Sequence, residues 1–429
     1  MIIHIPYGTL GISFELSDRN IRQIIFPLPE KTMPDVKSGL IHSIENPSGT
    51  PPLQEIINSK GDSKDVSVAI VCDDNTRPTP QKEVLDILIP YLQQQGILLS
   101  NVRIIIATGA GRSMTRDEIY IAFGSWISPV LTENHNCNEN LVNVGRSSSI
   151  GDIFVNKALV QSDLKIALGS VMPHPIYGFT GGSTIILPGA AALKTIHSFH
   201  RLALSSPGIK AGLLDNPLRK ESDYVADLIK LDFTINIAQN AADGICGIFC
   251  GYHREAFRQA ARYARKILEA KVMPDTDILI AGSYPKDADL WQTLLVFLNV
   301  SGIVHDGGAI VIVTPCSEGC SRGSGSLPNY IGKSSEELKK QLDDNSAADV
   351  SSAVLAYLVR KELQRVSACF LSGGIKPADA QSMHLDVCGN INEILTKARR
   401  KYGEDVTFSI APYGGKIFPV ISHDSPREN

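Results

Sequence analysis

The sequence predicts an α/β protein with two domains, mostly parallel sheets and flanking helices. Short apolar runs of strand length alternate with longer segments of helical periodicity, and Gly, Asp or Pro bounds each run. A chain of 429 residues is long enough for two or three domains of ordinary size. Strands that alternate with helices favour βαβ units, in which ligands bind at the carboxyl ends of the parallel strands.

Each expected element follows from one such run or periodic segment. The expected strands are residues 66–72, 102–107, 164–167, 277–281 and 309–314. The expected helices are residues 80–95, 114–123, 254–270, 288–299, 346–364 and 391–401. The long amphipathic segment 254–270 ends before Pro274, and a new α/β pattern then begins. We therefore predict an N-terminal catalytic and cofactor domain at 1–270, a C-terminal α/β domain at 275–415, and a polar tail at 416–429.

Composition narrows the class of partner. The net charge is −4 and the isoelectric point is near 6.2, so no broad basic surface is expected for nucleic acid or anionic membranes. No run approaches the 18 or more apolar residues of a membrane span, and the N-terminal segment lacks the pattern of a signal peptide. The sequence thus predicts a cytoplasmic protein that acts on a small molecule.

The eight cysteines do not form the pattern of a disulfide scaffold. Two pairs, Cys246 with Cys250 and Cys316 with Cys320, have a spacing that could hold a metal. Structural zinc sites combine such pairs with further ligands, and both pairs lie in small-residue or loop sequence. Buried thiols are the favoured interpretation.

Polar residues follow the first two interior strands. In the segment 73–80, Asp73, Asp74 and Thr76 either form a binding loop or shape a turn before the next helix, and the local pattern favours neither. Arg77 could grip a carboxylate or a phosphate with its planar guanidinium. After the second strand, the segment 107–112 offers two glycines and an arginine, which is a weak signal for an anion site.

The third loop is the most unusual part of the sequence. His174 lies between two prolines, and small residues, hydroxyls and bare amides follow it at 180–184. The pattern is typical of an anion cradle beside an imidazole. His197 and His200 come next, three residues apart, and would lie near one face of a helix. A single histidine is more often structural than functional, but this clustering favours a functional site.

Read together, these loops resemble the nickel-dependent lactate racemase family. The ordered motifs are DDNTRPTP, IATGAGRSMTRDEI, PHPIYGFTGGSTIILPG, TIHSFH, YPKDADLWQ and IAPYGG, and they span nearly the whole chain. The resemblance implies two α/β domains with the active site in the cleft between them. It also implies a nickel-pincer nucleotide, supplied by cofactor-biosynthesis enzymes, and a 2-hydroxyacid substrate that is racemised by transient hydride transfer.

The resemblance assigns roles residue by residue. His200 matches the nickel ligand, His174 matches a catalytic histidine, and Arg77 matches the arginine that binds the substrate carboxylate. Gln292 matches a glutamine near the substrate, with Trp291 as an apolar wall beside it. The nucleotide would be held by Asp73, Asp74, Thr76, Thr180, Gly181, Gly182, Ser183 and Thr184.

Three departures from the family pattern change the expected chemistry. Gly111 stands where the family has a second catalytic histidine. Ser183 and Thr184 stand where the family has an arginine and the lysine that is covalently joined to the cofactor. Leu295 replaces a lysine near the substrate. We therefore expect an untethered cofactor and a substrate larger or less charged than lactate.

The departures leave three interpretations. The favoured one is a 2-hydroxyacid racemase or epimerase in which Tyr177, His197 or His135 supplies the second base. A second is an enzyme of the same fold that performs a one-base oxidation, reduction or elimination of a hydroxy acid. The third is an inactive relative that binds a nucleotide or a hydroxy acid. Retention of His174 and His200 favours the first over the third.

Overall fold

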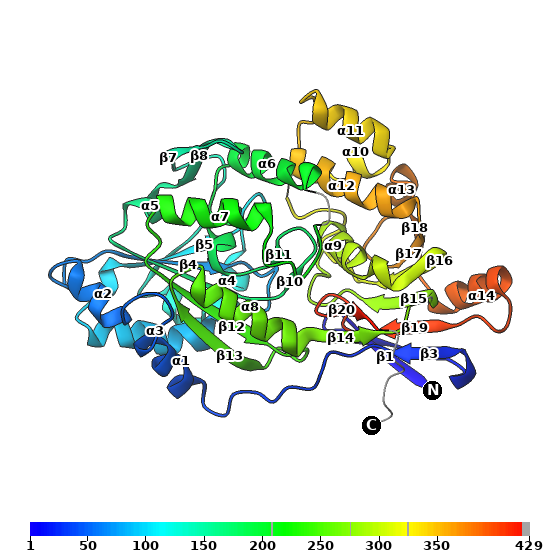
Figure 1. Ribbon diagram of the computed structural model, residues 1–429, viewed down its shortest axis with the longest axis horizontal. Helices are drawn as coiled ribbons and strands as arrows, with labels where there is room; N and C mark the ends of the chain where they lie inside the picture. Colours follow the sequence, from blue (N-terminus) through cyan, green and yellow to red (C-terminus); the bar gives the residue numbers. More distant parts are fainter. Residues whose placement is uncertain (207–208, 275, 324–325, 423–429) are drawn as a thin grey trace. The chain divides into compact units, whose positions relative to one another are not determined.

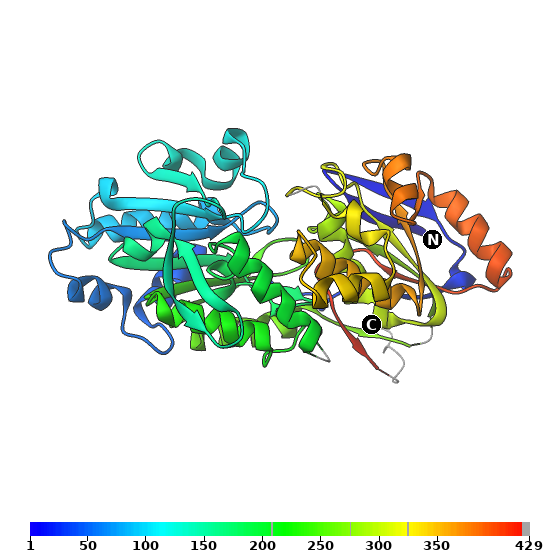
Figure 2. The ribbon, with the colours of Figure 1, turned by 90° about the horizontal axis from the view of Figure 1, so that it is seen from above.

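The computed structural model describes residues 1–206, 209–274, 276–323 and 326–422. The chain forms two compact units: unit 2 is the continuous stretch 29–267, and unit 1 combines residues 1–28 with the chain from 268 onward. Figure 1 shows the blue N-terminal strands in the same unit as the red C-terminal strands, and Figure 2 shows the same grouping from above. Residues 1–28 thus belong to unit 1, whereas the prediction placed them in the N-terminal domain at 1–270. Strand pairing explains the difference, because β3 hydrogen bonds to β19.

Unit 2 is built on a six-stranded sheet of order β13-β12-β9-β4-β5-β6, parallel except for the β12–β13 pair. The strands of unit 2, in this sheet and in two smaller ones, are β4 (Val68–Asp73), β5 (Val102–Ala107), β6 (Leu131–Asn134), β7 (Leu141–Ser147), β8 (Gly151–Asn156), β9 (Leu164–Ser170), β10 (Pro173–His174), β11 (Gly178–Phe179), β12 (Phe233–Gln239) and β13 (Ile245–Gly251). Its helices are α1 (Val36–Glu45), α2 (Leu53–Ser59), α3 (Gln81–Gln94), α4 (Arg116–Phe123), α5 (Lys157–Gln161), α6 (Leu193–Arg201), α7 (Pro217–Leu228) and α8 (Glu255–Leu268).

Unit 1 is built on a second six-stranded sheet, which is wholly parallel and has the order β18-β17-β16-β15-β19-β3. The strands of unit 1, in this sheet and in two smaller ones, are β1 (Ile2–Tyr7), β2 (Leu10–Glu15), β3 (Ile21–Ile24), β14 (Glu269–Val272), β15 (Thr276–Gly282), β16 (Val304–Val313), β17 (Ser367–Leu371), β18 (Asp386–Cys388), β19 (Phe408–Ala411) and β20 (Phe418–Ile421). Its helices are α9 (Leu290–Val300), α10 (Pro328–Ile331), α11 (Ser335–Asp343), α12 (Val350–Leu363), α13 (Pro377–Ser382) and α14 (Ile391–Tyr402).

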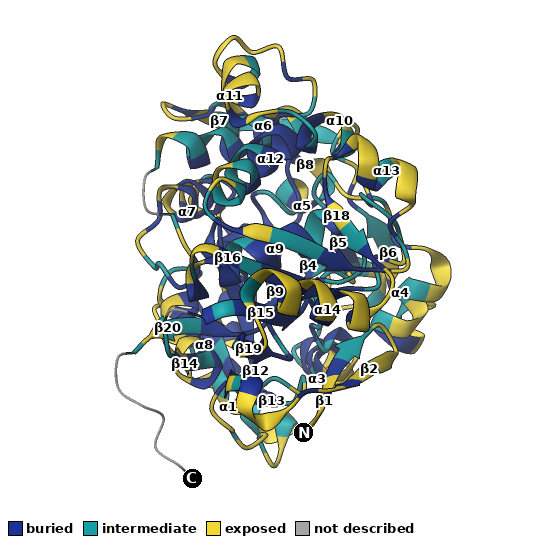
Figure 3. Cartoon of the chain, turned by 90° about the vertical axis from the view of Figure 1, so that its right-hand side faces the viewer, coloured by how far each residue is buried: buried dark blue, intermediate teal, exposed yellow. Residues whose placement is uncertain are grey.

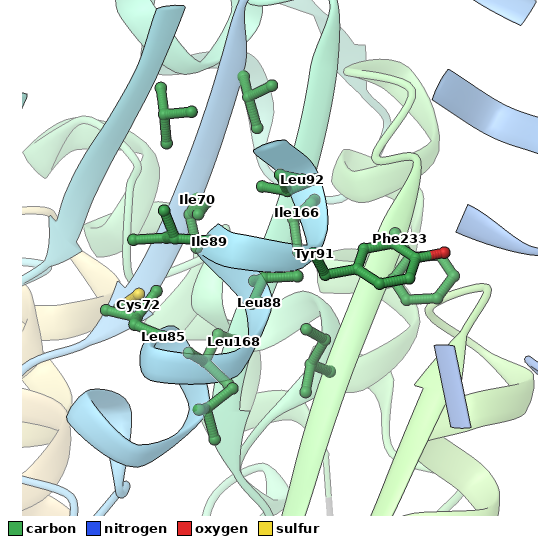
Figure 4. Close-up of a cluster of buried hydrophobic side chains, with 14 of the residues drawn as sticks. Ile70, Cys72, Leu85, Leu88, Ile89, Tyr91, Leu92, Ile166, Leu168 and Phe233 are labelled. Atoms are coloured by element: carbon green, nitrogen blue, oxygen red, sulfur yellow. The ribbon is translucent and has the colours of Figure 1, made fainter. Parts of the chain in front are cut away.

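The core of unit 2 explains why β4 lies at the centre of its sheet. Every residue from Val68 to Cys72 is fully buried, so both faces of this strand are covered. On one face, Leu85, Leu88 and Leu92 of α3 pack over the strands (Figure 4). The apolar positions of α3 recur at helical spacing, which directs one face of the helix onto the sheet. In Figure 3 the strands are mostly buried, whereas the outer faces of α11 and α14 are exposed.

The predicted polar tail at 416–429 is wrong in its first part. Residues Phe418–Ile421 form β20, which pairs in parallel with β14, and Lys416 is buried. The alternation that marks a strand is short here and follows two glycines, so the local sequence gave a weak signal. Residues 423–429 of the predicted tail lie outside the described residues. Among the helices that the structure describes, none is long and apolar enough to cross a membrane.

Candidate functional site

The loops that follow β4, β5 and β9 meet at one edge of the sheet of unit 2. These three strands are parallel neighbours in register, so their carboxyl ends point the same way. The backbone amide of Ser170 donates to Asp73 Oδ2 (2.9 Å), and the amide of Gly109 donates to the carbonyl of Gly189 (2.9 Å). The sequence-predicted residues of unit 2 therefore belong to one cluster of loops.

Asp73 joins the first loop to the end of β9. Its Oδ2 also accepts a hydrogen bond from the Thr79 hydroxyl (2.7 Å). Desolvation raises the pKa of Asp73 to about 6, although the Thr79 hydrogen bond and the Arg77 charge both favour the ionised form. Asp73 is thus held by protein groups at the point where a ligand-binding loop begins.

Asp74 and Thr76 form a local turn. Asp74 Oδ1 accepts hydrogen bonds from both the backbone amide and the hydroxyl of Thr76. Arg77 donates from Nη1 to the carbonyl of Thr76 (3.0 Å) and to its hydroxyl (3.1 Å). Arg77, Asn75 and Pro78 also line a groove of 920 Å³. The side chains of Asp74 and Thr76 therefore shape the turn that carries the arginine.

In the loop after β5, the arginine of the sequence signal is paired with a carboxylate. Arg112 forms a two-pronged ion pair with Glu118, with Nη2–Oε1 and Nη1–Oε2 distances of 2.5 and 2.7 Å. This hydrogen bonding lowers the pKa of Glu118 to about 2. Glu118 also completes the capping box that starts α4. Arg112 is thereby committed to the start of α4.

His174 is almost fully buried, with 1% of its surface exposed. Its Nδ1 accepts hydrogen bonds from the backbone amides of Ile176 and Tyr177, both at 3.2 Å. A ring nitrogen that accepts carries no hydrogen, so the neutral imidazole carries its hydrogen on Nε2. The loop thus holds His174 in a tautomer that donates from Nε2.

Tyr177 connects the two histidines of the site. Its ring stacks on His174 with a centroid distance of 4.2 Å and an interplanar angle of 6°. Its hydroxyl forms a hydrogen bond with Nε2 of His200, near the C-terminal end of α6. Burial raises the pKa of Tyr177 well above its usual value, and the nearby Arg77 only partly offsets this rise. The structure therefore brings His174, Tyr177 and His200 together.

The hydroxyls of the glycine-rich loop all have protein partners. Thr180 donates to the carbonyl of Ser170 (2.7 Å), and Thr184 donates to the carbonyl of Gly181 (2.8 Å). Ser183 donates to Asp223 Oδ1 (2.5 Å). These contacts fix the loop from within the protein.

The two glycines of this loop are required by protein packing. Gly181 and Gly182 have φ angles of 80° and 58°, which favour glycine. A Cβ on Gly181 would lie 2.7 Å from Val171, and one on Gly182 would lie 3.0 Å from Phe257. The tight turn at 181–182 thus depends on the absence of side chains.

A buried charged network supports the loop from below. Arg219 donates from Nη1 to the carbonyl of Gly181 (2.9 Å) and to the Ser183 hydroxyl (3.2 Å), and its guanidinium lies 3.8 Å from the centre of the Phe257 ring. Asp223 also pairs with Arg254 (3.2 Å). Sequence analysis missed Arg219 and Asp223, because they lie some 40 residues from the loop and carry no local motif.

The three candidates for the second base, His135, His197 and Tyr177, have different surroundings. His135 is buried, and its Nε2 and Nδ1 face the Ala191 carbonyl (2.9 Å) and the Asn156 amide (3.2 Å). Burial lowers the pKa of His135 and favours its neutral form. His197 is half-buried on α6, one turn before His200. Tyr177 has a stacked ring contact to His174.

Trp291 and Gln292 belong to unit 1, where they lie in the first turn of α9 and are half-buried. Asp289 caps this helix by accepting from the Gln292 amide (2.8 Å), and Leu295 is fully buried. The predicted contact of these residues with substrate, like the predicted cleft between domains, stays a prediction.

The fold and the site together define an α/β protein with a buried imidazole and phenol cluster at the carboxyl edge of a parallel sheet. A family model described as the lactate racemase N-terminal domain matches residues 7–212. A lactate racemase from Thermoanaerobacterium thermosaccharolyticum is 30% identical over 327 residues, which cover 74% of this chain and 75% of the relative. The chain belongs to the lactate racemase family, whose named members are isomerases.

Further relatives agree over longer stretches. A lactate racemase from Lactiplantibacillus plantarum is 26% identical over 423 residues, which cover 96% of this chain and 98% of the relative. The solved lactate racemase apoprotein from T. thermosaccharolyticum has a TM-score of 0.84 at 24% identity and covers 99% of this chain and 100% of its own. A Thermotoga maritima protein has a TM-score of 0.72 at 18% identity, covering 92% and 100%. These structures confirm the α/β fold.

Proposed function

We propose that the chain is a nickel-dependent racemase or epimerase of 2-hydroxy acids, acting on a substrate other than lactate. The observation that carries the proposal is the buried cluster of His174, Tyr177 and His200 in a member of the lactate racemase family. A buried imidazole with a hydroxyl at its Nε2 offers a nitrogen donor of the kind that nickel prefers. The chemistry of this donor therefore fits the metal.

The nickel-pincer nucleotide would be bound without a covalent bond to the chain. His200 would hold the nickel, and Thr184 lacks the amine that forms the family's tether. When bound, the cofactor supplies a group that reversibly accepts a hydride from the substrate carbon that bears the hydroxyl. The hydroxyls of Thr180, Ser183 and Thr184 already have protein partners, so we assign them to shaping the loop.

His174 would act on the C2 oxygen of the substrate. In the tautomer that the two amide contacts at Nδ1 favour, Nε2 donates a hydrogen bond and can stabilise negative charge on that oxygen. To act as a base, Nε2 must accept the proton of the substrate hydroxyl. The hydrogen of the neutral imidazole must then lie on Nδ1 instead of Nε2. The amides of Ile176 and Tyr177 must then turn away from Nδ1, so the backbone at 176–177 controls which of the two roles His174 plays.

Tyr177 is our candidate for the second acid/base group, in place of the histidine missing at Gly111. It lies beside His174, whereas both nitrogens of His135 already face protein partners. A second group is needed because the planar keto acid must be reduced, and its oxygen protonated, from either face. Tyr177 reaches this role only after its hydroxyl leaves His200, since the same atom now faces the metal donor.

Arg77 would bind the substrate carboxylate through its planar guanidinium. Leu295 stands where the resemblance implies a cation near the substrate, and Trp291 would add an apolar surface there. We therefore propose a substrate with a larger or less charged side chain than lactate. A racemase that turned over lactate as fast as any bulkier 2-hydroxy acid would contradict this choice.

The test is expression of the chain together with the cofactor-building enzymes, followed by metal analysis and mass spectrometry under denaturing conditions. We expect nickel bound to the protein, a cofactor released on denaturation, and racemisation of bulky 2-hydroxy acids. His200→Ala should lose the nickel, and His174→Ala should keep it while turnover falls by roughly 10²- to 10⁴-fold. Protein that binds neither nickel nor nucleotide would refute the proposal.

A one-base oxidoreductase or lyase of the same fold is the second candidate, favoured by Gly111 and by the donor tautomer of His174. The two functions differ in their products. A racemase converts one enantiomer into the other without net change, whereas the alternative releases a keto or unsaturated acid. Chiral chromatography of the product therefore separates them.

A further inference from the structure

A cluster of thiols and a carboxylate lies in unit 1, on strands that take no part in the proposed chemistry. Asp386 and Cys388 are two residues apart on the edge strand β18, so their side chains leave the same face of the sheet. Cys369 on β17 lies directly opposite Asp386 in the parallel register. Three potential metal ligands thus share one face of two neighbouring strands.

The distances within the cluster are short. The Sγ atoms of Cys369 and Cys388 are 3.4 Å apart, and the Cys388 Sγ lies 3.9 Å from Asp386 Oδ1. One ligand atom from each residue falls within 4.8 Å of both others. Two thiolates on a tetrahedral zinc, each about 2.3 Å from the ion, lie about 3.8 Å apart. Small side-chain rotations would therefore place all three ligands on one ion.

The cluster already attracts a cation. The Lys397 ammonium, carried on α14, lies 3.6 Å from both Asp386 Oδ1 and Cys388 Sγ. Asp386 raises the pKa of Lys397. Positive charge is therefore stabilised at this point of the fold.

Lys397 can leave the site without disturbing the core. Its side chain is 59% exposed, whereas Ile394, Leu395 and Ala398 of the same helix are buried in the cluster that includes Cys388. Packing of α14 thus does not depend on the ammonium group. A metal ion could replace it while the helix stays in place.

We propose that Cys369, Asp386 and Cys388 bind a borderline or soft divalent cation such as Zn²⁺, in exchange for the ammonium of Lys397. Two sulfur ligands and one carboxylate select zinc or cadmium over Mg²⁺ and Ca²⁺, which prefer oxygen ligands. Three protein ligands leave the fourth position of a tetrahedral ion to water. The ion would join β18 to β17 at the edge of the sheet.

The other cysteines provide an internal control. Cys246 and Cys250 lie four residues apart on β13, where four residues span about 13 Å, too far for one ion. Spacing along the sequence is therefore a poor guide here, because strand geometry separates this pair and brings Cys369 and Cys388 together although they are 19 residues apart.

The test is titration of the reduced full-length chain with Cd²⁺, followed through the ultraviolet thiolate-to-cadmium absorption band. We expect a single ion per chain, displaced by Zn²⁺ and not by Mg²⁺. Cys369→Ser and Cys388→Ser should weaken binding by at least about tenfold, and Asp386→Asn should weaken it less. The double variant Cys246→Ser/Cys250→Ser should bind like the wild type.

Lys397→Ala distinguishes a metal site from a mere ion pair. Removal of the competing ammonium should tighten Cd²⁺ binding about two- to fivefold, an increase that misfolding does not produce. Circular dichroism checks that the serine variants fold. A band that survives both serine substitutions would overturn the proposal. A reduced chain that binds no Cd²⁺ would also overturn it. The same holds for a chain that binds no Cd²⁺ because oxidised glutathione joins Cys369 and Cys388 in a disulfide.

Discussion

The two six-stranded sheets carry a similar carboxylate near their carboxyl edges, but the surroundings differ. Desolvation raises the pKa of Asp73 in unit 2 and of Asp289 in unit 1 to about 6. Asp289 accepts from two backbone amides, of Gln292 and Arg322, and so serves the start of α9 and its neighbouring loop. Asp73 instead ties two loops of the imidazole site together. A raised pKa at a sheet edge therefore does not by itself mark the chemical site.

The largest effect should come from the network beneath the glycine-rich loop. Arg219→Met removes a buried guanidinium and leaves three buried acceptors without their donor, namely the carbonyls of Phe179 and Gly181 and the hydroxyl of Ser183, which should lower the free energy of unfolding by about 3–5 kcal/mol. Urea unfolding measures the loss. Arg254→Met is the matched control, because its side chain is 30% exposed and its ion pairs should contribute about 1 kcal/mol or less. Equal losses in both variants would show that Arg219 has no special role.

Backbone strain should give the next largest effect. Gly181→Ala combines a φ of 80° with a Cβ contact of 2.7 Å to Val171, and should cost about 1–3 kcal/mol. Gly302 of unit 1 offers the comparison, because no atom lies within 4 Å of a Cβ added there. Gly302→Ala should leave the melting temperature nearly unchanged. Similar melting temperatures for the two variants would contradict the strained turn.

The two carboxylates can be compared through pH. A folded pKa of about 6 exceeds the unfolded value near 3.9, so folding binds protons between these values. The associated stability is full below about pH 4 and is lost as pH rises through 6. Relative to the wild type, Asp73→Asn and Asp289→Asn should each gain roughly 2–3 kcal/mol of stability between pH 4 and pH 7.5. Parallel pH profiles for wild type and variants would rule out the raised pKa values.

The smallest effect concerns the contact between Tyr177 and His200. Tyr177→Phe removes the hydroxyl that now faces Nε2, and a single hydrogen bond contributes about 1 kcal/mol. Loaded protein of this variant should retain nickel against a chelator roughly fivefold longer than the wild type. Racemisation should fall at the same time if Tyr177 is the second acid/base group. Faster nickel loss would show that Tyr177 supports the metal instead.

The sequence predicted the fold best where a signal was local. The run 102–107 became β5 with the same bounds, because apolar residues between polar loops allow little else. The strands β12 and β13 were not predicted, although both are almost entirely buried. Neither was the pairing of β3 with β19, since contacts between residues nearly 400 positions apart leave no local pattern.

The candidate site was predicted in part for the same reason. Prolines and glycines identified the loop with His174, and helical spacing identified His200. The link between them through Tyr177 depends on how the loop folds against α6, which no spacing reveals. The engagement of Ser183 and Thr184 by protein groups was likewise invisible, because their partners are a distant side chain and a backbone carbonyl.

The division of the chain also affects the order of assembly. Unit 2 is continuous, whereas unit 1 begins with residues 1–28 and resumes only at 268. During synthesis the ribosome releases all of unit 2 before β15 and β19, the strands that complete the sheet with β3. The first 28 residues are therefore made before the strands of the unit 1 sheet with which β3 pairs, and the whole of unit 2 is made in between. During synthesis, β3 therefore stays without its partner in this sheet until β19 has been made.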